Sequence, residues 1–87
     1  MDHFLYDDTE TTRTRFIGFA GETQRFDLAV ITTQRFYGKF LVLDMQSNQL
    51  AILGPDDLKK NGYLEEAYGL DKEGGQELRN FLELIII

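Results

Sequence analysis

The sequence contains no cysteine, so it can form neither a disulfide framework nor a thiolate zinc site. Small secreted domains usually depend on disulfides, and no apolar segment of the signal-peptide type follows Met1. We therefore expect a cytoplasmic protein. Long apolar runs are also missing: the terminal 84–87 segment is far shorter than the roughly 20 residues that cross a bilayer. No membrane partner is expected.

Histidine and serine occur once each, as His3 near the N-terminus and as Ser47 in a predicted turn. A serine nucleophile needs a neighbouring base, and the folded part of the chain offers no histidine for that role. A zinc site would have to rest mainly on carboxylates, which is not the usual pattern. We therefore predict no catalytic residue, no metal site and no cofactor, and a protein that is not an enzyme.

Adjacent carboxylates occur at 7–8, 56–57 and 65–66, but no loop has the alternating acids, glycine and distal glutamate of an EF-hand. The glycines form neither a phosphate-binding loop nor a dinucleotide motif. An enzyme that uses carboxylates alone ranks last among the functional hypotheses.

Basic residues are fewer than acidic ones, 9 against 15, which gives a net charge of −6. The imbalance lies at the two ends, in 1–12 and 46–87, whereas 13–45 is mildly basic. Overall charge of this sign disfavours nonspecific binding to nucleic acid or to anionic lipid.

Four segments have the composition of β-strands, at 13–20, 26–33, 39–45 and 49–53. The polar segments between them are too short for parallel crossovers, so the strands should pair as antiparallel hairpins. The simplest arrangement is a four-stranded antiparallel meander.

Helical signals follow the strands. Gly54-Pro55 predicts the start of a short helical turn, and 63–68 predicts a second one that Gly69 stops. A C-terminal amphipathic helix is indicated by the spacing of Leu78, Phe81, Leu82 and Ile85. Asp71 can cap it, but two glycines at 74–75 should fray its start, so its body should begin near Gln76. We predict an N-terminal arm, 1–12, and a single α+β domain, 13–87, with the C-terminal helix packed on the sheet.

The predicted strands are too apolar for a sheet with one bare face. Apolar residues run together at 29–31, 40–43 and 50–53, whereas a half-solvated antiparallel sheet alternates apolar with polar residues. One C-terminal helix covers one face. The other face needs the N-terminal arm, the short helical turns or a second copy of the chain.

Two groups of residues are candidate binding sites. The segment 34–39 is too polar for a strand and rich in the residue types that dominate binding hot spots, so Arg35, Phe36, Tyr37 and Lys39 form a candidate interaction surface. A plain hairpin connection is the structural alternative. Basic side chains among the aromatic residues of the sheet also suggest contacts with single-stranded nucleic acid. The candidate contacts are Arg13, Arg15 and Arg25.

The chain resembles a family of short uncharacterised proteins of Bacillus-type and Staphylococcus-type Gram-positive bacteria. Eight segments carry the resemblance: 4–9, 14–16, 24–29, 37–39, 41–46, 54–58, 62–65 and 78–82. It implies a cytosolic α+β protein of a domain-of-unknown-function family, with no known activity and no functional residues to carry over.

The leading hypothesis is a non-enzymatic interaction or regulatory domain that acts through its sheet surface or the 34–39 segment. Its partner would be a second copy of the chain or another protein. The alternative is weak binding of single-stranded nucleic acid through the basic and aromatic sheet region.

Overall fold

The computed structural model describes residues 3–86, which form one antiparallel sheet with helices on one side. The sheet has four strands in the order β1-β2-β3-β4. They are β1 (Arg13–Ala20), β2 (Arg25–Thr32), β3 (Phe40–Asp44) and β4 (Gln49–Leu53). Each strand pairs antiparallel with its neighbour in the chain, so the predicted meander is confirmed.

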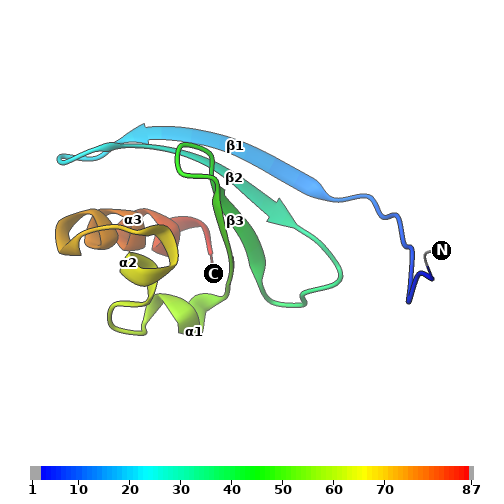
Figure 1. Ribbon diagram of the computed structural model, residues 1–87. Coiled ribbons are helices and arrows are strands. Elements are labelled where there is room, and N and C mark those ends of the chain that lie inside the picture. The colour runs from blue at the N-terminus through cyan, green and yellow to red at the C-terminus, as the bar shows by residue number, and fades with distance from the viewer. Residues whose placement is uncertain (1–2, 87) are drawn as a thin grey trace.

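The helices follow the sheet in the chain and lie on the same side of it (Figure 1). They are α1 (Pro55–Leu58), α2 (Tyr63–Tyr68) and α3 (Lys72–Ile85). Pro55 occupies the first turn of α1, and Gly69 ends α2 in a left-handed conformation at φ 65°. The predicted α+β class, with short helical turns and a C-terminal helix packed on the sheet, is confirmed. Within residues 3–86, no helix is both long enough and apolar enough to cross a membrane.

Strand register decides which side chains meet the helices. Phe19 pairs with Phe26, and Val30 pairs with Val42, so these four side chains share the face that the helices cover. Phe19 stacks on Phe26 and also on Phe81 of α3, with ring centroids 4.9 and 4.1 Å apart. The long β1–β2 hairpin therefore reaches over α3 and is fixed there by aromatic packing.

The hydrophobic core lies between this face and the helices. Its most deeply buried side chains come from β2, β3, β4, α2 and α3. They are Phe26, Leu28, Val42, Leu53, Leu64, Leu78 and Leu82. Tyr68 joins them and donates its hydroxyl proton to the Val42 carbonyl at 2.6 Å. Burial raises the pKa of Tyr68, so this hydroxyl stays protonated and keeps its bond throughout the neutral range.

The start of α3 differs from the prediction. The helix begins at Lys72 and not near Gln76, and Asp71 caps it by accepting a bond from the Gly74 amide at 2.7 Å. Gly74 and Gly75 are buried, because neighbouring side chains pack directly against their backbone. Glu65 of α2 occupies the space beside Gly75. Tertiary packing thus outweighs the poor helix propensity of glycine here.

This packing makes Gly75→Ala destabilising although alanine is the better helix former. A Cβ at Gly75 would overlap the Glu65 carboxylate, which ion-pairs with Arg79 at 3.2 Å. We expect a net loss of about 1 kcal/mol in the free energy of unfolding. In a Glu65→Ala background the overlap is gone, and Gly75→Ala should instead stabilise by about 1 kcal/mol. Urea denaturation of the four proteins measures both values, and the same sign in both backgrounds would contradict this account.

Candidate interaction surfaces

The face of the sheet opposite the helices is apolar and uncovered. We call it the open face and define it by seven side chains: Phe16, Ala29, Ile31, Leu41, Leu43, Leu50 and Ile52. Register places Phe16, Ala29, Leu43 and Leu50 in one row across all four strands. The outer members of this row are well exposed, Phe16 at 73% and Leu50 at 55%.

Charge on this side of the sheet is confined to one end. Arg25 and Asp27 form an ion pair at 3.0 Å, and the Gln46 amide donates to Asp27 at 2.7 Å. The bond from Gln46, and secondly that from Arg25, hold the pKa of Asp27 below its usual value. The charges of Arg25 and Asp27 therefore compensate one another, and none of the seven side chains of the open face is charged.

Two of the three possible covers for the second face, the arm and the short helical turns, do not lie on it. The short helices lie with α3 on the other side, and residues 3–12 lead away from the sheet (Figure 1). Tyr6 lies under the Arg35 guanidinium at 5.1 Å, and Asp8 pairs with Arg35 at 3.3 Å. Glu10 accepts bonds from Thr33 and from the Gln34 amide. These polar contacts hold the arm on the loop after β2, so neither of the two local alternatives covers the second face.

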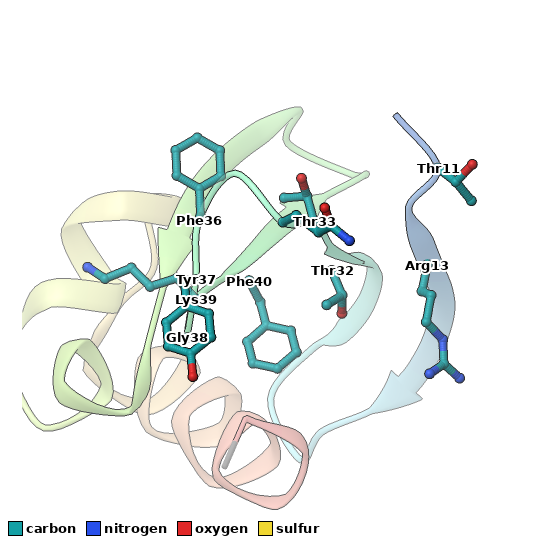
Figure 2. A pocket seen from close by; sticks show the side chains of 10 residues that line it. Thr11, Arg13, Thr32, Thr33, Phe36, Tyr37, Gly38, Lys39 and Phe40 are labelled. Carbon is teal, nitrogen blue, oxygen red and sulfur yellow. The ribbon is translucent and has the colours of Figure 1, made fainter. Parts of the chain in front are cut away.

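A pocket of about 470 Å³ lies at the end of the sheet, between β1 and the loop that joins β2 to β3 (Figure 2). Figure 2 shows Arg13 on β1 facing Phe40 and Tyr37 across the pocket, with Thr32 between them. A smaller hollow of about 250 Å³ continues along β1 to Arg15. Arg13 and Arg15 are two positions apart on β1, so their side chains share one face of the sheet. Pairing of Arg15 with Val30 places this face on the helix side and not on the open face.

The sequence candidates are thus divided among three places. Phe36, Tyr37 and Lys39 line the pocket together with Arg13. Arg35 instead bonds to the arm, and Arg25 lies at the far end of β2 in its pair with Asp27.

Two groups of residues were not predicted as site residues from the sequence. Thr32 and Phe40 of the pocket pair across β2 and β3, so only the strand register reveals them. Phe16 and Leu50 of the open face were signalled only indirectly, by apolar residues on both sides of the strands. Within residues 3–86, no three His, Cys, Asp or Glu side chains are grouped to hold a metal ion.

Lys39 is fixed at the pocket by Asp57, a carboxylate whose side chain is only 7% exposed. Asp57 accepts a bond from the Gly54 amide at 2.8 Å and lies 3.5 Å from the Lys39 ammonium and 3.3 Å from that of Lys60. The Gly54 bond is the main cause of a lowered pKa for Asp57, and the two ammonium groups add to it. Asp57 therefore stays ionised and pairs with both ammonium groups.

Asp57→Asn should lower the free energy of unfolding by about 1 kcal/mol at neutral pH. Since the folded state lowers the pKa of Asp57, its stabilisation is complete above the ordinary value of 3.8 and is lost as the pH falls further. The difference in the free energy of unfolding between the variant and the natural protein should therefore become smaller in acid. Urea denaturation at several pH values measures it. Asp56→Asn replaces an exposed acid in the same helical turn and is the control; it should cost only about 0.3 kcal/mol, the low end for an exposed charge at a helix N-terminus.

The fold and surfaces define a small α+β domain with a four-stranded sheet covered on one face and an apolar face left open. The chain belongs to the SAV0927-like family, whose family model matches residues 5–84. The family's description states no activity. No curated protein matches the chain. Membership of one family over nearly the whole chain is thereby confirmed, whereas the bacterial group and the cytoplasmic location stay predictions.

Proposed function

We propose that the protein is a non-enzymatic interaction domain that self-associates through the open face. The observation that carries this proposal is the row of apolar side chains that crosses all four strands, with its outer members exposed. A contiguous apolar patch of a few hundred Å² is about the largest that a monomeric soluble protein usually exposes, and such patches are often functional.

The size of the open face fits a weak dimer. Four strands about 4.8 Å apart and about five residues long, at about 3.4 Å per residue, give a projected face of roughly 300 Å². Two such faces remove at least about 600 Å² from water, and side-chain relief adds to this area. The total stays in the class of small, transient interfaces. We expect a dissociation constant of roughly 10 to 100 µM.

Shape and charge favour a second copy of the chain as the partner that binds the open face. A two-fold axis parallel to the strands places Phe16 opposite the partner's Leu50, and Ala29 opposite the partner's Leu43. Each large side chain at the centre then meets a small one. The open face carries no charge, so it offers nothing that would select a charged partner, whereas an uncharged apolar face is complementary to itself.

Sedimentation equilibrium between about 5 and 500 µM tests the proposal. At physiological salt, where charges more than about 8 Å apart are screened, the protein should pass from monomer to dimer. Low salt should weaken the dimer, because two chains of charge −6 then repel one another. A protein that remains monomeric at high micromolar concentration in both conditions would refute self-association.

The nucleic-acid alternative has less support. Stacking of nucleobases needs exposed aromatic rings beside basic side chains, and the exposed Phe16 lies on the side opposite Arg13 and Arg15. On the side of these arginines, Asp8 and Glu10 of the arm border the aromatic loop and disfavour a polyanionic strand. Arg25 is occupied by Asp27. Titration of labelled single strands at low and high salt tests this alternative, since phosphate contacts are strongest at low salt.

A further inference from the structure

We infer that the pocket beside β1 binds a small arylalkyl carboxylate, a molecule with one aromatic body and one carboxylate group. This site lies on the helix side of the sheet, at its end, and does not depend on self-association through the open face. Four features of the pocket support the inference: its volume, its aromatic wall, its unpaired arginines and the acids that border it.

The volume suits a small molecule. About 470 Å³ lies within the range of about 300 to 1,000 Å³ that is typical of ligand pockets. The hollow of about 250 Å³ shares Arg13, Thr32 and Phe40 with it and extends the space along β1 to Arg15. A ligand with a two-ring body and a short acidic arm therefore fits with its acidic group towards β1.

The wall opposite β1 is aromatic. Phe36, Tyr37 and Phe40 line the pocket from the loop and the start of β3 (Figure 2). Phe40 is half-buried and fixed by the sheet, whereas Tyr37 is 98% exposed and presents a free ring at the margin. Gly38 permits this turn with a φ of 76°. Rings placed in this way offer both stacked and edge-on contacts to an aromatic ligand.

The arginines of β1 supply the charge. Within residues 3–86, neither Arg13 nor Arg15 forms an ion pair, whereas Arg25, Arg35 and Arg79 each pair with a carboxylate. Two unpaired guanidinium groups are notable in a chain with 15 acidic residues. They are two positions apart on one strand, so their Cα atoms lie roughly 7 Å apart and their side chains share one face. The planar fork of a guanidinium matches a carboxylate with two parallel hydrogen bonds.

The surroundings favour a small anion over a polyanion. Lys39 is paired with Asp57, which leaves Arg13 and Arg15 as the cations beside the pocket that lack an ion pair within residues 3–86. Asp8 and Glu10 of the arm border the same loop and would repel a chain of phosphates that continued past the pocket. A single carboxylate beside β1 avoids this repulsion.

Amide-resolved NMR titration tests the site with 2-naphthylacetate against its neutral analogue, 2-naphthylacetamide. We expect saturable shifts of the Thr32, Gly38 and Phe40 amides, and at least tenfold tighter binding of the carboxylate. Equal affinities would refute the role of the arginines. Shifts centred on Leu43 and Leu50 would place the ligand on the open face and would overturn the assignment.

The variant Arg13→Gln/Arg15→Gln should lose at least tenfold in affinity for the carboxylate and should keep its affinity for the amide, which also verifies that the pocket is folded. Arg25→Gln/Lys59→Gln is the matched control, since it removes two positive charges elsewhere. An equal loss in the control would show that only overall charge matters and would refute the site. These results leave the dimer proposal untouched, so the two proposals fail separately.

Discussion

Leu82→Ala should lower the free energy of unfolding by about 3 kcal/mol. Leu82 lies on the buried side of α3 with no exposed surface, within the cluster that also contains Leu28, Leu53 and Leu78. Its removal loses the transfer free energy of the side chain and leaves a cavity that a close-packed core refills only in part. A chain of this length has a total stability of about 4 to 13 kcal/mol, so the loss is a large fraction of it.

Leu84→Ala removes the same atoms from the same helix and is the matched control. Leu84 is 75% exposed, so its truncation should cost less than about 0.5 kcal/mol. Urea denaturation measures the free energy of unfolding of both variants. We expect the same dependence of this free energy on urea concentration in each. A similar loss in the two variants would mean that α3 does not pack on the sheet through the face described above.

Leu50→Glu should weaken the proposed dimer at least a hundredfold, which corresponds to about 2.7 kcal/mol. In a two-fold interface each substitution counts twice, and each new carboxylate would be buried against the partner's Phe16 without a counter-charge. Since Leu50 is exposed in the single chain, the folded monomer should tolerate the change. Sedimentation equilibrium measures the dissociation constant, and thermal unfolding at low concentration verifies the fold.

Leu84→Glu controls for the added negative charge. It also replaces an exposed leucine but lies on α3, away from the open face, so the dimer should persist. If Leu84→Glu dissociates the dimer and Leu50→Glu does not, the interface lies on the helical side. A dimer that survives both changes would point to pairing along the free edge of β1, and either outcome overturns the open-face proposal.

Self-association and ligand binding would use opposite sides of one sheet. The helices bury the face that carries Val30 and Val42, and the pocket lies where this cover ends, beside Arg13. The open face has no comparable cover within residues 3–86. The dimer variants and the ligand variants therefore change different surfaces and can be combined without direct interference.

Local patterns in the sequence were sufficient for the secondary structure except for the start of α3. Short polar turns dictated hairpins, Gly54-Pro55 and Gly69 marked helix ends, and Asp71 was correctly expected to cap α3. These signals act within a few residues and need no knowledge of the fold. The start of α3 was misplaced because the role of Gly75 depends on Glu65, a residue of another helix.

The sequence by itself determined the four-stranded meander, the terminal helix and the scarcity of residues for the common catalytic sites. Only the tertiary structure decided which sheet face the helices cover, because both faces are apolar and the paths of the connections make the choice. It also brought Arg13 and Tyr37 to one pocket, since strand register and loop path join residues that no local pattern relates. The surplus of apolar strand surface thus became a defined open face only after folding.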